Sequence, residues 1–430
     1  MKQLTRLFIP ICLETLFYML SGMVDTLMLS AVGDYAVGAV GTANSYIGIF
    51  IIMFSIISSG MVSVMTQNIG AGRPGVAYQA RQLGLLFNAV AGVLMAVFLF
   101  SGAGAILRML GIADALYEPA LIYLKIVGGG CILNAVIPIF SSYLRAFGYT
   151  KQPLYATIVG NIANFVMNAV FLFVLHKGVA GVAAATVISK ILNLCIVLYF
   201  SHKLISAKNS TERIANKTVL GQIVKVGLPS ACDNVAMMLV IRFLNQMDAE
   251  GLNVTARSYT ATISNFSYCV GAALAQANAI MTGWHIGAGE LEECDRGTKR
   301  AAFVGVCVAV CMETAIVLGS GFIMPLFTDN PEMTALVRKL LAIDIVLEIG
   351  RVTNLVFGQA LKTSGDAVFP AVIAAVFMFV FAVGGTWLFG ISMGLMAVGA
   401  YIGLASDECV RAVGMVWRWK TGKWRTKKLV

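Results

Sequence analysis

Long apolar runs, separated by short polar stretches, follow one another along the whole chain. A membrane-spanning α-helix needs about 20 predominantly apolar residues, and twelve runs meet that length. They cover residues 5–30, 42–66, 83–108, 118–144, 153–175, 179–201, 219–246, 256–281, 298–324, 335–361, 367–389 and 394–417. The first run is too long for the apolar part of a signal peptide and carries two carboxylates, Glu14 and Asp25. The pattern therefore predicts an all-α polytopic membrane protein with twelve transmembrane helices.

The composition agrees with this interpretation. Hydrophobic residues make up 59% of the 430 residues and charged residues only 12%, whereas a soluble domain is about 45–50% apolar and about 25% charged. The mean hydropathy of +0.84 also excludes a disordered chain. The nine cysteines are scattered and the three histidines lie far apart in sequence, so we expect neither a disulfide framework nor a structural metal site.

The basic residues predict how the chain crosses the membrane. Of the 31 Lys and Arg residues, 21 fall on the side that holds the N-terminus, 5 on the opposite side and 5 inside spans. Because Lys and Arg favour the cytoplasmic side, both termini should be cytoplasmic. The net charge of +10 is then a signal of topology, and we expect no nucleic-acid partner.

The two halves of the chain resemble each other. Residues 69–72 (IGAG) recur as residues 286–289; Leu144, Gly148 and Pro153 recur as Leu361, Gly365 and Pro370; and Pro10 and Glu14 match Pro229 and Asp233. The first two offsets are 217 positions and the third is 219. Six spans per repeat give both halves the same orientation, so we predict two six-helix bundles related as parallel repeats. The predicted domains are an N-terminal lobe (1–201), a cytoplasmic linker (202–217), a C-terminal lobe (218–417) and a basic cytoplasmic tail (418–430).

A duplicated helical bundle of this size favours a transporter, because alternating access is readily built between two repeats. A membrane-embedded enzyme is the alternative from another class. It would need a reactive constellation, and the sequence contains no HExxH or Walker motif. We therefore expect no enzyme and no cofactor, and no direct use of ATP.

Several short motifs resemble the multidrug and toxic compound extrusion (MATE) family. They are Val24-Asp25-Thr26 after Pro10, residues 67–73 (QNIGAGR), residues 144–148 (LRAFG) before Pro153, and Leu361-Lys362 with Gly365-Asp366 and Pro370. Their order and spacing cover essentially the whole chain. The resemblance implies a multi-pass antiporter of the inner (plasma) membrane. Such a protein exports small organic compounds, often cationic and amphipathic, in exchange for H⁺ or Na⁺.

Ionisable residues inside spans are costly, at roughly 2.5–3.5 kcal/mol on insertion scales, and are therefore functional candidates. The match of residues 24–26 to the family implies that Asp25 is a cation-coupling carboxylate and a possible Na⁺ ligand; an interfacial or capping role is the alternative. Asn161, Asn164 and Asn168 share one helical stripe and, with Thr186, can coordinate a cation or join helices. The family often has a carboxylate at the position of Asn168.

In the C-terminal half, the tenth span is the most charged. Asp344, Glu348 and Arg351 share one stripe with Asn354 beside it, and Asp233 lies in the seventh span. These five are candidates for substrate binding or coupling, although Glu348 and Arg351 also suit a structural ion pair. Sodium-type relatives carry an acid near the position of Arg351, so the resemblance leaves a sodium site here in doubt.

A flippase of lipid-linked saccharides is a further alternative. It would need a cationic cavity for a pyrophosphate, with several Arg residues at mid-span, and the net charge of the cavity separates it from a drug antiporter. We expect a monomer in the lipid bilayer, with small organic compounds as its substrates.

The topology can be tested by labelling. In intact cells, a Ser210→Cys variant should be protected from impermeant thiol reagents, because the basic linker is predicted to be cytoplasmic. Labelling of this variant above the level of the parent chain would overturn the predicted orientation.

Overall fold

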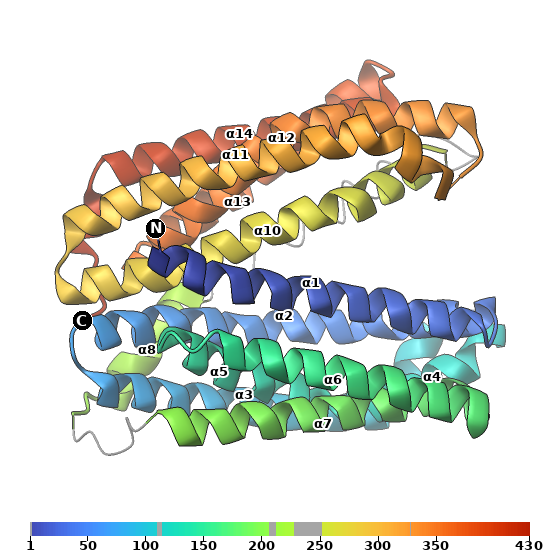
Figure 1. Cartoon of the computed structure of the whole chain (residues 1–430), viewed down its shortest axis with the longest axis horizontal. Helices are drawn as coiled ribbons and strands as arrows, with labels where there is room; N and C mark the ends of the chain where they lie inside the picture. The colour runs from blue at the N-terminus through green and yellow to red at the C-terminus, as the bar shows by residue number, and fades with distance from the viewer. Residues whose placement is uncertain (1, 110–113, 206–211, 228–251, 327) are drawn as a thin grey trace. The chain divides into compact units, whose positions relative to one another are not determined.

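The computed structural model describes residues 2–109, 114–205, 212–227, 252–326 and 328–430, and these residues form helices joined by short connections (Figure 1). No strand occurs among them. The chain divides into two compact units, of which one is Ile9–Gly227 and the other is Met1–Phe8 with Leu228–Val430. The predicted all-α class is therefore confirmed, while the predicted domain limits at residues 201, 217 and 417 stay predictions.

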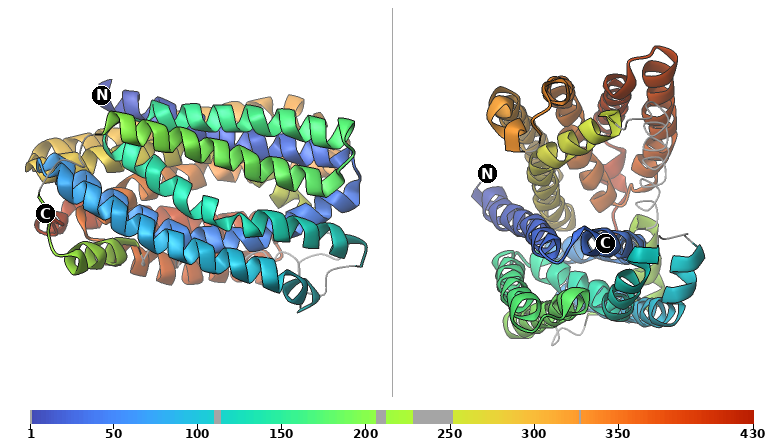
Figure 2. Two further views of the ribbon diagram at one scale, coloured as in Figure 1. Left: turned by 90° about the horizontal axis from the view of Figure 1, so that it is seen from below. Right: turned by 90° about the vertical axis from the view of Figure 1, so that its right-hand side faces the viewer.

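The first unit contains the helices of the first six predicted spans, from Ile9 of α1 onward, and α8, which belongs to the seventh. In order they are α1 (Lys2–Ser30), α2 (Asp34–Gly70), α3 (Pro74–Met109), α4 (Asp114–Gly129), α5 (Cys131–Ala146), α6 (Lys151–Ala169), the π-helix η1 (Val170–Val174), α7 (Gly178–Leu204) and α8 (Asn216–Gly227). Helices α6 and α7 lie side by side (Figures 1 and 2). The predicted span 118–144 consists of two helices, because α4 and α5 meet at Gly130 with a bend of 42°. Three consecutive glycines, 128–130, weaken the helix there.

Two glycines bring α8 against α2. A Cβ atom on Gly60 would lie 2.0 Å from the carbonyl oxygen of Ile223, and one on Gly227 would lie 2.0 Å from that of Ile56. Only glycine permits so close an approach of two backbones. The chain before α8 is also tied to this unit, because the Gln79 amide donates to the carbonyl of Ile214 at 2.7 Å.

The second unit is built around one long central helix. Its elements are α10 (Leu252–Ala288), α11 (Leu291–Ile323), the 3₁₀ helix η4 (Met324–Leu326), α12 (Pro331–Ser364), α13 (Val368–Phe377), the π-helices η5 (Met378–Val383) and η6 (Thr386–Ser392), α14 (Met396–Lys420) and the 3₁₀ helix η7 (Lys423–Thr426). Helix α12 packs against α10, α11 and α14. Asp233 and most of the predicted span 219–246 lie outside the described residues.

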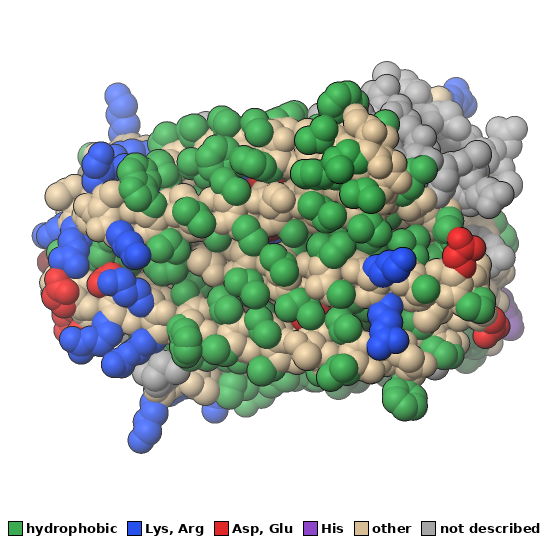
Figure 3. All heavy atoms as spheres, turned by 90° about the horizontal axis from the view of Figure 1, so that it is seen from above, with side chains coloured by type: hydrophobic (Ala, Val, Ile, Leu, Met, Phe, Trp, Pro, Cys, Tyr) green, Lys and Arg blue, Asp and Glu red, His purple; other side chains and the backbone are tan. Residues whose placement is uncertain are grey.

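Length and hydropathy mark six of the described helices as able to cross a membrane, or up to eight if each bent pair is one span. On the face of the second unit seen in Figure 3, hydrophobic side chains cover the middle of the helices, and Lys and Arg gather mainly at one end. Phe303, Leu318 and Phe322 of α11 are 72%, 73% and 86% exposed. Such apolar surfaces suit lipid rather than water.

The repeated glycine motifs terminate helices. Gly72, Gly289, Gly148 and Gly365 all have positive φ angles, of 76°, 80°, 85° and 97°. At each one the glycine N–H bonds to the carbonyl three residues earlier, and the next N–H bonds to the carbonyl five residues earlier. This is the Schellman pattern, which ends a helix and favours glycine. The sequence repeat thus records equivalent helix ends in the two halves.

The predicted basic tail packs against the second unit. The Trp424 ring stacks on Trp419 with centroids 4.1 Å apart, and both side chains are 1% exposed. The Trp419 indole donates to Asp295 of α11 at 2.7 Å, and Arg418 pairs with Asp366, in the turn after α12, at 2.7 Å. The tail and the end of α14 therefore contact the ends of both α11 and α12.

A pair of glycine substitutions tests this packing. Gly365→Ala should lower the unfolding temperature of the purified protein more than Gly289→Ala does. Both impose a left-handed conformation on alanine, which costs roughly 1–2 kcal/mol. At Gly365 the new Cβ would also lie 2.2 Å from the carbonyl oxygen of Lys427, whereas Gly289 has open space. Equal losses in the two variants would show that the tail does not pack on this turn.

Candidate functional site

In the first unit, an amide holds the Asp25 carboxylate. Asn168 of α6 donates to Asp25 Oδ1 at 2.7 Å and to Asn164 Oδ1 at 3.0 Å. The Asn168 side chain is fully buried, and Ala169 separates it from the π-helix η1. The structure therefore brings together three of the residues predicted for the cation site.

The other two predicted residues donate hydrogen bonds to backbone carbonyls. The Asn161 amide donates to the carbonyl of Phe17 at 2.8 Å, and the Thr186 hydroxyl donates to the carbonyl of Val182 in its own helix at 2.9 Å. The asparagine stripe of α6 is therefore divided, with two amides at Asp25 and one on the backbone of α1.

Two further charged groups of the first unit have defined partners. The Lys190 ammonium of α7 donates to Asn134 Oδ1 at 2.8 Å. Glu14 of α1 pairs with Arg145 of α5 at 2.6 Å, so this carboxylate is tied to the Arg of the LRAFG motif. Sequence reasoning assigned no role to Lys190, although a lysine in an apolar span was a usable signal.

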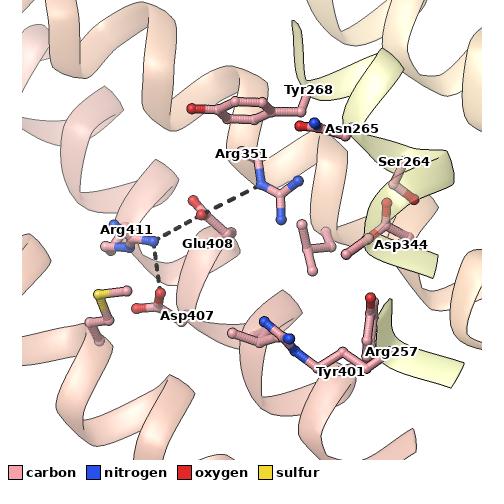
Figure 4. A pocket seen from close by; sticks show the side chains of 14 residues that line it. Arg257, Ser264, Asn265, Tyr268, Asp344, Arg351, Tyr401, Asp407, Glu408 and Arg411 are labelled. Carbon is pink, nitrogen blue, oxygen red and sulfur yellow. Dashed lines mark ion pairs between the residues drawn. The ribbon is translucent and has the colours of Figure 1, made fainter. Parts of the chain in front are cut away.

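The second unit encloses a cavity of about 280 Å³ between α10, α12 and α14 (Figure 4). Its lining contains arginines, acids and tyrosines as well as apolar side chains. The polar lining residues are Arg257, Ser264, Asn265, Tyr268, Asp344, Arg351, Tyr401, Asp407, Glu408 and Arg411. Three predicted residues belong to this region, since Asp344 and Arg351 line the cavity and Glu348 pairs with Arg351.

A continuous ion network connects α12 and α14. Arg351 pairs with Glu348 in its own helix, as the spacing predicted, and its Nε lies 3.7 Å from Glu408 Oε1. Arg411 pairs with Glu408 at 2.9 Å and with Asp407 at 2.8 Å (Figure 4).

Asn354, the fourth predicted residue of the α12 stripe, joins the network through α14. Its amide donates to Glu408 Oε2 at 2.9 Å. A Cβ atom on Gly350 would lie 2.7 Å from the backbone nitrogen of Cys409, so this glycine lets α12 and α14 touch and sets Arg351 beside Glu408. The sequence analysis did not predict this junction between the two helices.

Several carboxylate oxygens of this unit lack hydrogen-bond partners. They are Asp344 Oδ2, Glu348 Oε2 and both oxygens of Glu313, and all three side chains are at most 2% exposed. A buried charge is costly unless a cation or a proton neutralises it. Arg351 neutralises part of this charge. Among the described residues, no group of three or more His, Cys, Asp or Glu side chains could hold a metal ion.

A double-mutant cycle tests the Glu348–Arg351 pair. Breaking a buried pair leaves an uncompensated charge and costs about 3–5 kcal/mol, so Glu348→Gln or Arg351→Gln alone should lower thermal stability more than the double replacement does. The control is the exposed Glu293–Arg296 pair of α11, which has the same spacing and should contribute about 1 kcal/mol or less. Additive losses at positions 348 and 351 would show that the two side chains are not coupled.

Comparison with known proteins places the chain in a family. The MatE family model matches residues 10–170 and 226–388. An uncharacterized transporter, YisQ of Bacillus subtilis (strain 168), is 32% identical over 428 residues, which cover 97% of this chain and 94% of that protein. The probable multidrug resistance protein NorM of Thermotoga maritima is 21% identical over 444 residues, which cover 100% and 94% of the two chains.

Solved structures show the same fold. A crystal structure of MATE in the straight conformation matches with a TM-score of 0.88 and 21% identity, over 99% of this chain and 97% of that one. A transporter from Pyrococcus furiosus, described as having a binding pocket of reverse polarity that suggests a different function, matches with a TM-score of 0.83 and 21% identity, over 99% and 96%. The fold is thus the two-lobe, twelve-helix architecture of these transporters, and the chain belongs to the MATE family of multi-pass membrane transporters.

Proposed function

We propose that this protein is a secondary antiporter that exports small organic compounds, often cationic and amphipathic, in exchange for H⁺ or Na⁺. One observation carries the proposal beyond family membership: the Asp25 carboxylate on α1 is held by the fully buried amide of Asn168 on α6, at 2.7 Å. An ionisable group inside a membrane span, with a specific partner on another helix, marks an ion pathway more often than a structural role.

The Asp25–Asn168 contact suggests how cation binding moves helices. An ionised carboxylate accepts a strong, charge-assisted hydrogen bond, which weakens when a cation or a proton neutralises the group. Neutralising Asp25 therefore loosens α1 from α6. Asn168 is followed by the π-helix η1, and π-helical turns are frequent at functional sites. The matching position of the second half, 217 residues later, also holds a π-helix, η6. Both halves therefore have a π-helical turn at the same position of the repeat.

The cavity of the second unit bears on the flippase alternative. Its lining contains three arginines, at positions 257, 351 and 411, and three acids, at positions 344, 407 and 408. These charges balance, whereas a pyrophosphate would favour an excess of positive charge. The lining therefore supports the antiporter over a carrier of lipid-linked saccharides.

We further propose that the protein resides in the inner (plasma) membrane as a monomer, with both termini in the cytoplasm. The excess of Lys and Arg on the side of the N-terminus supports this orientation. The NorM relative, named as a probable multidrug resistance protein, supports the class of substrate.

Replacing Asp25 tests the proposal. Asp25→Asn nearly keeps the volume but removes the charge, so the variant should fold and insert yet lose most of its gradient-driven export. The measurement is efflux of ethidium, an amphipathic organic cation, from vesicles under an imposed proton or sodium gradient. Asp329→Asn makes the same chemical change at an exposed position and should export like the parent. Undiminished export by Asp25→Asn under both gradients would remove Asp25 from the coupling mechanism.

A further inference from the structure

The wall of the second unit's cavity contains a carboxylate that has no ion-pair partner among the described residues. Asp344 of α12 lines the cavity, is 2% exposed, and has a buried Oδ2 atom without a hydrogen-bond partner. Glu408, in contrast, is approached by both Arg351 and Arg411. Since a buried charge is costly when it lacks a partner, this part of the wall favours a ligand with a positively charged group.

A hydroxyl group lies beside this acid. Ser264 of α10 also lines the cavity, is 4% exposed, and has a buried Oγ atom without a hydrogen-bond partner in the described part of the chain. Figure 4 shows Ser264 next to Asp344, so the two side chains come together from two different helices. A carboxylate and a hydroxyl oxygen can both accept hydrogen bonds from a protonated amine. This pair of acceptors therefore suits an ammonium group.

The same face of α12 carries a guanidinium two helical turns away. Asp344, Leu347 and Arg351 all line the cavity, and seven residues correspond to about 10 Å along a helix. Arg351 bonds to Glu348 through Nη1, and its Nε lies 3.7 Å from Glu408. No ion pair of the described residues uses its Nη2 atom or joins it to Asp344. Space for a ligand is therefore left between the acid and the guanidinium, beside Leu347.

The guanidinium is held in an orientation that suits a carboxylate. It points into the space between Glu408 and Asp344 (Figure 4), and the Tyr268 ring lies 5.6 Å from its central carbon. A guanidinium donates directional, charge-assisted hydrogen bonds to a carboxylate. The cavity therefore offers acceptors for a cation at one end of this face and a donor for an anion at the other.

Size and net charge both favour a small zwitterion over a large organic cation. The cavity of about 280 Å³ is at the lower limit of the roughly 300–1,000 Å³ that is usual for ligand pockets. Its lining contains three arginines and three acids. A ligand with one positive charge would change the net charge of this lining, which is costly in a low-dielectric interior, whereas a zwitterion would not.

We propose that this cavity binds small zwitterions of amino-acid size. Asp344 and Ser264 hold the ammonium group, and Arg351 holds the carboxylate. The apolar lining residues Leu347 and Leu404 contact a short apolar side chain. This inference rests on the proposed function and deepens it, because it names a second class of substrate for the same transporter, bound in the lobe that does not contain Asp25.

Binding of three related probes to the purified protein tests the inference, with thermal unfolding as the readout. The probes are leucine, which is a zwitterion; 3-methylbutylamine, which lacks the carboxylate; and 4-methylpentanoate, which lacks the ammonium group. Leucine should bind about tenfold or more tightly than either analogue, because each analogue leaves one charged group of the cavity without its partner. Absence of leucine binding, or equal or tighter binding of 3-methylbutylamine, would overturn the inference.

Variants of the lining locate the site. Asp344→Asn and Ser264→Ala should weaken leucine binding, the former about tenfold or more. Arg351→Lys keeps the charge but loses the planar donor group, and should reduce the preference for leucine over 3-methylbutylamine. Asp329→Asn, at an exposed position, is the control and should bind leucine like the parent. Ser264→Ala serves if Asp344→Asn does not fold. A folded variant of either residue that binds leucine as tightly as the parent would contradict the inference.

Transport in vesicles separates the inference from the proposed function. Gradient-driven export of both ethidium and radiolabelled leucine supports the two proposals together. Export of ethidium but not of leucine would overturn the inference alone. Asp344-dependent binding of leucine, with gradient-driven export of neither compound, would overturn the proposed function and leave the cavity as a binding site for zwitterions.

Discussion

The cost of placing a charge in the apolar interior of a membrane governs this structure. A single ionisable side chain at mid-membrane costs several kcal/mol unless a partner compensates it. Most of the chain meets this constraint with apolar helices. Several of the charges that are retained have partners on neighbouring helices: Glu14 with Arg145, Asp25 with Asn168, and Arg351 with Glu408. The packing of the helices therefore determines which charges can be placed inside the membrane.

The two units solve this problem in different ways. The first unit keeps one acid and one amine apart, each bound to an amide, so that a single proton or ion changes the net charge of the site. The second unit packs acids and arginines into a dense network around a cavity. There, Arg351 and Arg411 each pair with two carboxylates, and both contact Glu408. The first arrangement suits a site that exchanges an ion. The second suits a framework that holds α12 and α14 together beside the cavity.

Much of the fold follows from the sequence because its signals are strong and local. Apolar runs of span length predicted the helices, and the repeated glycines marked helix ends that the structure caps in the same way. The spacing of Glu348 and Arg351 predicted their pairing. Contacts between helices were harder to predict, since they depend on where two backbones touch. Gly350 sets Arg351 beside Glu408, and nothing in the local pattern around Gly350 distinguishes it from other glycines.

The candidate site of the first unit was only partly predicted, again because contacts between helices are hard to predict from sequence. Helical periodicity placed three asparagines on one stripe, but it could not tell that Asn161 would bind the backbone of α1 while Asn168 would reach Asp25. The stacking of Trp424 on Trp419 was also beyond a composition argument, which took the tail only as basic.

The central claim is that the charge of Asp25 is exchanged when substrate binds. Its most direct test is proton release from purified protein in weakly buffered solution on addition of ethidium, followed with a pH indicator. The account predicts release by the parent protein and none by Asp25→Asn, with ethidium binding retained in both. Ethidium binding that releases as many protons from Asp25→Asn as from the parent would contradict it.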